Sequence, residues 1–264
     1  MNEKNEACNL KEELSQKSFR KHSPLKETRF IIAVGSGKGG VGKTTASVLL
    51  SLALREEGFK VGLYDLDFYG PNATLLLTMD KVTPLRCPEG FKPAEICGLK
   101  VMSLSFLVSE REPLFMRGLM AGKLLQELTM KVVWGPLDFL VLDLPPSTGD
   151  IFLSMLSLFN PDGFVLVTTP HRMALADSLR TLSILKVERV PLLGIIQNMA
   201  DLYGEPEEFS AFLEETKVPL LLEIPYIKFL SQGKPLEEFG ESKDMQELLK
   251  KLAEAFLKKV FRFH

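Results

Sequence analysis

The chain has 264 residues, of which 45% are hydrophobic and 25% are charged, and its formal net charge is -2. This composition is typical of a soluble globular protein with enough apolar residues for a core, and a general nucleic-acid binder would normally be far more basic. No run approaches the roughly 20 apolar residues of a membrane span, and the N-terminus lacks an apolar signal-peptide stretch. Three cysteines are too few for a disulfide framework. We therefore expect a cytoplasmic protein.

The first 28 residues are rich in Glu, Lys, Asn and Ser and contain few large apolar side chains. Such a segment cannot bury enough apolar surface to fold by itself. We therefore predict a flexible or docked N-terminal arm at 1–28. No repeat or Pro/Gly-rich linker divides residues 29–264, which predicts a single domain there.

A glycine-rich loop follows the apolar run Phe30–Val34 and precedes an apolar helical stretch. Gly37 is separated by four residues from Gly42, Lys43 and Thr44, which is the spacing of a phosphate-binding loop. In such a loop, glycines let backbone N–H groups point at phosphate oxygens, and the following helix contributes its positive end. Lys43 is predicted to neutralise the outer phosphates and the Thr44 hydroxyl to bind Mg²⁺.

From residue 29 onward, apolar runs of strand length alternate with helical stretches. The runs are uninterrupted, as in a parallel sheet covered by helices on both faces. Strands are predicted at 30–34, 61–64, 139–142, 164–167, 192–196 and 219–222, and helices at about 119–132, 150–159, 172–187, 205–216 and 243–261. The predicted fold class is α/β, a single-domain P-loop NTPase with a mainly parallel central sheet.

Two aspartates lie at or just beyond the carboxyl ends of predicted strands. Asp67 follows the strand at 61–64, and Asp143 closes the run at 139–142. Ligands of such sheets bind beyond the carboxyl ends of the strands, where these carboxylates can face a γ-phosphate or hold Mg²⁺ through water. Read alone, Asp67 would more simply be a loop aspartate that caps the next turn. Together with the phosphate loop, the two aspartates predict a magnesium site formed by Thr44, Asp67 and Asp143.

The C-terminal stretch 245–264 places apolar residues at helical spacing and basic residues on much of the opposite face. A basic amphipathic helix can lie on a membrane surface. It can also be the last helix that covers the sheet, with its basic residues near the negative end of the helix dipole. We favour the covering helix, and we expect neither a membrane nor a nucleic acid as partner.

The run from Lys38 to Thr44, Lys-Gly-Gly-Val-Gly-Lys-Thr, resembles the signature of the deviant Walker A ATPases, the class of MinD, ParA, the nitrogenase iron protein and the Mrp/ApbC proteins. In that class the first lysine reaches across a dimer interface to the partner's nucleotide. The resemblance implies this role for Lys38 and a homodimer with nucleotide at the interface. Without the resemblance, Lys38 is a solvated surface lysine.

Further motifs between about residues 29 and 240 resemble the Mrp/ApbC family. They lie at 65–72, 98–107, 117–118, 134–146, 168–170 and 197–199. The resemblance implies a dimeric P-loop protein that binds ATP and carries iron–sulfur clusters to target proteins. It also implies that Asp67 is the first switch aspartate, that Asp143 is the Walker B residue, and that the amide of Asn198 contacts adenine. Read alone, Asn198 could equally satisfy loop backbone.

One departure concerns the cluster. The family places Cys-x-x-Cys shortly after the equivalent of Met199, but residues 198–206 contain no cysteine. Cys87 and Cys97 could approach each other in space and hold a cluster, or they could be small buried hydrophobic residues. Binding of an iron–sulfur cluster by this chain is therefore left open.

These observations predict an ATP-binding, ATP-hydrolysing dimeric switch that uses Mg²⁺ and acts with an iron–sulfur client or scaffold protein, hydrolysing ATP slowly and under partner control. The alternative is a MinD/ParA-like positioning ATPase without a cluster. The predicted catalytic residues are Lys38, Lys43 and Asp67. The predicted nucleotide-binding residues are Gly37, Lys38, Gly39, Gly40, Val41, Gly42, Lys43, Thr44, Thr45 and Asn198.

Overall fold

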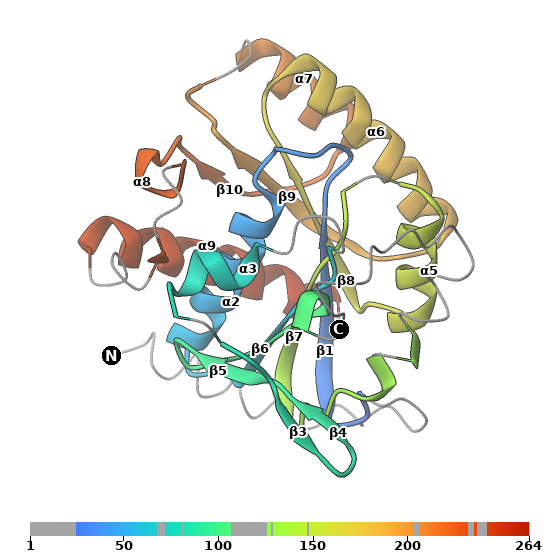
Figure 1. Cartoon of the computed structure of the whole chain (residues 1–264). Helices are drawn as coiled ribbons and strands as arrows, with labels where there is room; N and C mark the ends of the chain where they lie inside the picture. Colours follow the sequence, from blue (N-terminus) through green and yellow to red (C-terminus); the bar gives the residue numbers. More distant parts are fainter. Residues whose placement is uncertain are drawn as a thin grey trace.

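The structure is a computed structural model that describes residues 25–67, 72–80, 82–106, 126–127, 129–146, 148–202, 206–231, 235–236 and 242–263. Most of the predicted arm at 1–28 and of the predicted helix at 119–132 lies outside these ranges. The described residues form a central sheet with helices on both of its faces (Figure 1).

The central sheet has eight strands in the order β10-β9-β8-β1-β7-β2-β6-β5. Their bounds are β1 (Thr28–Gly35), β2 (Val61–Asp65), β5 (Ala94–Ile96), β6 (Leu99–Ser103), β7 (Leu137–Asp143), β8 (Gly163–Thr168), β9 (Leu192–Asn198) and β10 (Leu220–Ile224). Every neighbouring pair is parallel except β5 and β6. A separate antiparallel hairpin is formed by β3 (Leu85–Cys87) and β4 (Gly90–Lys92). All six predicted strands are confirmed, whereas β3 to β6 were not predicted.

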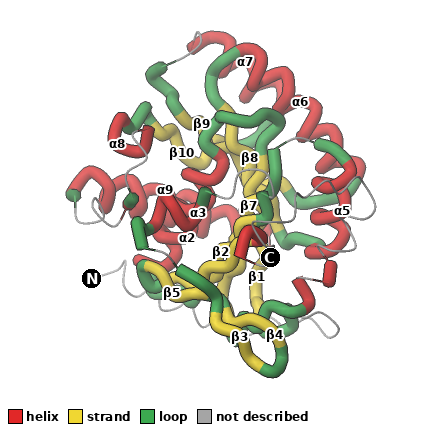
Figure 2. Tube along the Cα trace, in the orientation of Figure 1, coloured by secondary structure: helices red, strands yellow, loops and turns green. Residues whose placement is uncertain are grey.

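The helices form two layers, red on either side of the yellow strands in Figure 2. The helices are α2 (Lys43–Glu56), α3 (Ala73–Leu77), α5 (Asp150–Phe159), α6 (Arg172–Val187), α7 (Pro206–Thr216), α8 (Lys228–Ser231) and α9 (Lys243–Phe263), with a short 3₁₀ helix at Leu104–Phe106. Buried apolar residues of α2, α3 and α9 belong to one core, and those of α5 and α7 belong to the other. Helix α6 contributes Leu175 and Leu185 to this second core and Ala174 to the first. The predicted helices at 150–159, 172–187, 205–216 and 243–261 are confirmed.

The uninterrupted apolar runs reflect burial on both faces of the sheet. In β1, Phe30, Ile32 and Val34 pack in the core with α2 and α9, while Ile31 and Ala33 pack in the core with α5 and α6. Successive side chains of a strand point to opposite faces, so a strand between two helix layers needs apolar residues at every position.

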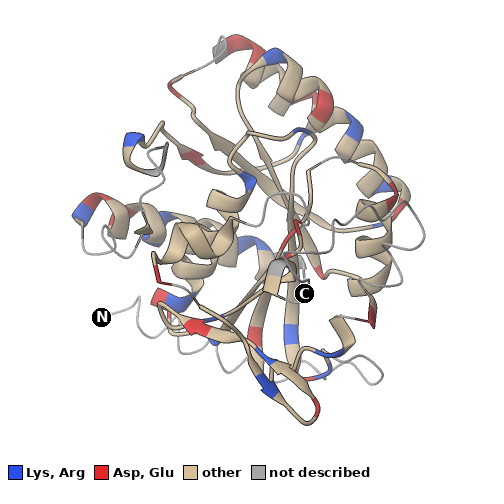
Figure 3. Cartoon of the chain, viewed as in Figure 1, with Lys and Arg blue, Asp and Glu red and all other residues tan. Residues whose placement is uncertain are grey.

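The last helix, α9, covers the sheet. Its apolar residues Leu249, Leu252, Phe256 and Val260 are buried in the core that contains α2, so the covering-helix interpretation of 245–264 is confirmed. No helix of the described part is both long and apolar enough to cross a membrane. Acidic and basic residues are interspersed along the outer helices (Figure 3), in line with the small net charge.

The chain order creates a switch point beside β1. The chain leaves β1 through α2 to β2, beyond β7, whereas it leaves β7 through α5 to β8, on the other side of β1. In sheets of this kind the carboxyl ends of the strands at such a reversal form a crevice that binds ligands. The glycine-rich loop starts at this point.

Candidate functional site

The loop that joins β1 to α2 is shaped by glycines. Gly40 and Gly42 have φ angles of 81° and 83°, a left-handed conformation that favours glycine because it has no Cβ atom. Gly42 is the N-cap of α2, and the helix begins at Lys43. The first amides of a helix have no partner within it and lie at the positive end of its dipole. This turn is therefore suited to an anion.

Two glycines of the loop lie too close to their neighbours for a larger residue. A Cβ atom on Gly37 would lie 2.4 Å from the backbone of Asp177 in α6, and one on Gly42 would lie 2.0 Å from the Asn198 side-chain nitrogen. Asn198 also donates a hydrogen bond from Nδ2 to the carbonyl oxygen of Val41, at 3.0 Å. The loop is therefore held between α6 and the end of β9, and Asn198 satisfies loop backbone.

Replacing Gly37 with alanine is expected to lower the free energy of unfolding by about 1–3 kcal/mol, the usual cost of extra volume in a packed site. The Asp177 backbone cannot yield without shifting α6. Gly39→Ala is the matched control, because a Cβ atom there meets Pro146 at 3.9 Å, an ordinary contact. Chemical denaturation measures the difference, and equal unfolding midpoints for the two variants would contradict the tight fit at Gly37.

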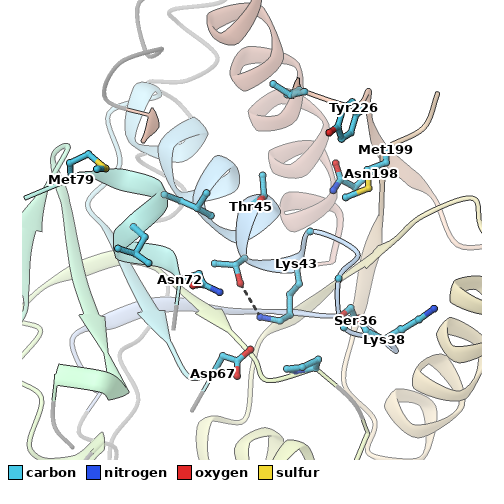
Figure 4. Close-up of a pocket in the computed structure, with 18 residues that line it drawn as sticks. Ser36, Lys38, Lys43, Thr45, Asp67, Asn72, Met79, Asn198, Met199 and Tyr226 are labelled. Carbon is cyan, nitrogen blue, oxygen red and sulfur yellow. Dashed lines mark hydrogen bonds between the residues drawn. The ribbon is translucent and has the colours of Figure 1, made fainter. Parts of the chain in front are cut away.

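A buried ion pair joins the loop to β7. Lys43 Nζ lies 2.7 Å from Asp143 Oδ1, and the two side chains are 6% and 0% exposed. The hydroxyl of Ser47, one turn further along α2, donates to the same oxygen at 2.8 Å. Lys43 Nζ also donates to Thr44 Oγ1 at 3.4 Å (Figure 4). Lys43 thus ties the start of α2 to the end of β7.

The second oxygen of Asp143 is suited to a cation. Asp143 Oδ2 is buried without a hydrogen-bond partner among the described residues, and a buried polar atom in that condition is costly. The hydroxyl of Thr44 accepts a hydrogen bond from the Lys43 ammonium, which also contacts Asp143. The Asp67 carboxylate points toward this ammonium in Figure 4. Carboxylate, hydroxyl and water oxygens are the ligands that Mg²⁺ prefers. The donor set of Thr44, Asp67 and Asp143 therefore fits Mg²⁺.

A second buried carboxylate, that of Asp65, lies next to Asp143. The two residues are cross-strand partners in the register of β2 and β7. Burial and the neighbouring Asp143 charge raise the pKa of Asp65 to about 7, against the lowering effects of two backbone N–H donors and of Lys43. Asp65 and Ser47 were not predicted as site residues. Asp65 closes a buried strand as Asp143 does, and Ser47 lies four residues after Lys43, on the same face of the helix.

A cavity of about 660 Å³ opens beside the loop. Its size lies within the range of small-molecule sites, roughly 300–1,000 Å³. The predicted site residues that line it are Lys38, Gly39, Gly40, Gly42, Lys43, Thr44, Thr45, Asp67 and Asn198. Three predicted residues are not part of the lining. Gly37 packs on α6, Val41 is buried, and Asp143 contacts Lys43.

The cavity joins a polar end to apolar walls. Met79, two residues beyond α3, lies on one side, and Met199 and Tyr226 lie on the opposite side next to Asn198 (Figure 4). Leu75 and Leu76 of α3 also line the cavity. A nucleotide has the same division between its phosphates and its base. Lys38, which also lines the cavity, is exposed, and its side chain extends away from Lys43 (Figure 4).

Comparison with known proteins identifies the class. A family model described as NUBPL iron-transfer P-loop NTPase, of the ParA type, matches residues 27–259. The chain belongs to this family. The iron-sulfur cluster carrier protein of Aquifex aeolicus is 45% identical over 175 residues, which cover 65% of this chain and 48% of that protein. The Synechocystis protein of the same name is 36% identical over 234 residues, 83% of this chain and 66% of that protein.

Solved structures confirm the P-loop NTPase fold of this NUBPL-type chain. The nucleotide-binding protein of Archaeoglobus fulgidus, in complex with ADP, has a TM-score of 0.65 and 30% identity and covers 96% of each chain. MinD of Pyrococcus horikoshii, in complex with Mg-ADP, has a TM-score of 0.64 and 25% identity and covers 86% of this chain and 95% of its own. The resemblance to Mrp/ApbC proteins is confirmed, although the chain spans only about half to two thirds of the two carrier proteins.

Proposed function

We propose that this P-loop NTPase is an ATP-hydrolysing switch that acts in the assembly or transfer of iron–sulfur clusters. The observation that carries the proposal is the buried Lys43–Asp143 ion pair, which joins a phosphate loop to the neighbouring strand beside a cavity of nucleotide size. The family's iron-transfer description and the names of the carrier relatives support an iron–sulfur cluster as the cargo. The neighbours solved with ADP and Mg-ADP support the nucleotide.

In the proposed reaction water attacks the γ-phosphate of ATP, and ADP and inorganic phosphate leave. The loop amides and Lys43 hold the phosphate oxygens, and Asp67, which lines the cavity, orients the attacking water. Thr44, Asp67 and Asp143 are the residues that would hold Mg²⁺, the aspartates through water, and the bound ion neutralises phosphate charge. Asn198 lines the cavity next to Met199 and Tyr226, where it would contact the adenine.

We propose further that two copies meet at the mouth of this cavity. Lys38 is exposed there and points away from its own Lys43, as a residue that serves a partner's nucleotide must. Leu75, Met79 and Tyr226 line the cavity and are 60%, 70% and 39% exposed. Burying exposed apolar side chains at this rim would stabilise the dimer.

The cluster is the cargo in this proposal, and a cluster-bearing scaffold or client protein is the partner. Cys87 ends β3, and Cys97 lies in the turn between β5 and β6. Cys8 lies outside the described residues. Cys87 and Cys97 are half-buried, and they are the described thiols that could contribute to carriage.

Phosphate release from ATP and Mg²⁺ tests the proposal, measured alone, with a cluster-loaded scaffold protein and with anionic liposomes. We expect slow basal release that the cluster-loaded protein stimulates and the liposomes do not, because the apolar face of α9 is already buried. A Cys87→Ser/Cys97→Ser variant, reconstituted anaerobically with iron and sulfide, serves as the control for carriage by this chain. Release stimulated by liposomes alone, or no release at all, would count against the proposal.

A further inference from the structure

The carboxylate of Asp65 holds two separate points of the backbone. Its Oδ1 accepts a hydrogen bond from the N–H of Asp67 at 3.1 Å, and its Oδ2 accepts one from the N–H of Ala73, also at 3.1 Å. Ala73 is the first residue of α3. One side chain at the end of β2 therefore fixes both the residue that carries the predicted switch carboxylate and the start of the next helix.

Both backbone amides that Asp65 holds belong to segments that line the cavity. Asp67 lines it directly, and α3 supplies Leu75 and Leu76 to its wall. Asp65 is fully buried and is not one of the lining residues. Its side chain therefore acts on the cavity through the backbone that it holds.

The surroundings of Asp65 indicate that its carboxylate serves function rather than the stability of the fold. It faces Asp143 across the β2–β7 pair, so two buried carboxylates lie side by side, with Lys43 in direct contact with Asp143. Like charges in a buried site destabilise the fold, and asparagine has nearly the same shape without the charge. The two N–H groups meet different oxygens of Asp65, however, and asparagine has an NH₂ group, which only donates, in place of one of them.

We propose that Asp65 is a positioning residue, which sets Asp67 and α3 against the phosphate end of the cavity without touching the nucleotide. The proposal rests on the proposed ATP hydrolysis at this site. In this proposal, the two acceptor oxygens of Asp65 hold the backbone in the geometry that turnover needs. The loop and Lys43 bind the phosphates.

The test compares Asp65→Asn with Asp162→Asn. Asp162 also accepts a hydrogen bond from a backbone N–H of the sheet, that of Ile31 at 2.8 Å, but it lies before the start of β8 and far in the fold from the carboxyl edge. We expect Asp65→Asn to lower kcat at least tenfold, to change the dissociation constant for ATP less than about threefold, and to leave the thermal midpoint unchanged or raised. Asp162→Asn is expected to leave kcat unchanged.

Amide hydrogen exchange provides a readout independent of turnover. In Asp65→Asn, the amide of Asp67 or of Ala73 is expected to exchange at least tenfold faster than in the wild type, because one of the two bonds to the side chain is lost. Unchanged exchange at both amides, or unchanged kcat, would overturn the proposal. So would a loss of ATP affinity as large as the loss of kcat, since Asp65 would then hold the phosphate site itself. If the wild type shows no turnover, the proposed function fails, while the exchange rates still decide whether Asp65 holds both amides.

Discussion

Replacing Lys43 with alanine is expected to weaken ATP binding by about 10- to 100-fold. Lys43 lines the cavity and is the lysine of the phosphate loop. A hydrogen bond to a charged group contributes about 1.5–3 kcal/mol, and each 1.4 kcal/mol corresponds to about a factor of ten in affinity. Equilibrium titration with a fluorescent ATP analogue in the presence of Mg²⁺ measures the effect.

The same substitution leaves the buried Asp143 without its counterion, so the free energy of unfolding is expected to fall by about 3–5 kcal/mol. The double variant Lys43→Ala/Asp143→Asn separates the two effects. Removing the uncompensated charge should restore most of the stability while ATP affinity stays low. An affinity equal to that of the wild type in the single variant would show that the ammonium does not hold phosphate.

Replacing Lys38 with alanine is expected to abolish dimerisation induced by a non-hydrolysable ATP analogue. Lys38 is exposed and extends away from the Lys43 of its own chain, so its charge is available to the nucleotide of a second copy. Loss of that interaction removes a charge-assisted contact from each half of the interface. Light scattering with and without the analogue measures the mass of the complex.

Lys60→Ala is the matched control for Lys38→Ala. Lys60 is also exposed, but it precedes β2 and lies at the opposite end of the strand from Asp65. Removing its charge is expected to leave the nucleotide-dependent mass increase intact. A Lys38→Ala protein that dimerises like the control would rule out the role across the interface.

The predicted strands are correct where burial on both faces imposes a local signal. Leu140 and Val141 of β7 pack in opposite cores, so the run 139–142 in the middle of that strand is uninterruptedly apolar. The last two strands at one side of the sheet, β6 and β5, give no such signal. Lys100 is only half-buried in β6 and Glu95 is exposed in β5, because a strand near the edge of a sheet is not enclosed on both sides. Strand order depends on contacts between distant segments, which no local pattern encodes.

The phosphate loop could be predicted because its glycines have local backbone requirements, as at Gly42. The tight fit of Gly37 against α6 could not, since Asp177 is distant in sequence. The same holds for the carboxylate of Asp65, whose importance comes from its pairing with Asp143 and from its two backbone donors. Asn198 was predicted at the nucleotide site, but its hydrogen bond to the loop carbonyl of Val41 depends on tertiary contact.

The phosphate-binding role of the loop is tested most directly by calorimetric titration of the wild-type chain with ATP and Mg²⁺. We predict saturable heat with one nucleotide bound per chain, because the sequence contains one phosphate loop, whose Lys43 lines the cavity. A titration that releases no heat beyond dilution, at protein concentrations that would detect millimolar affinity, would contradict the assignment of this site to a nucleotide.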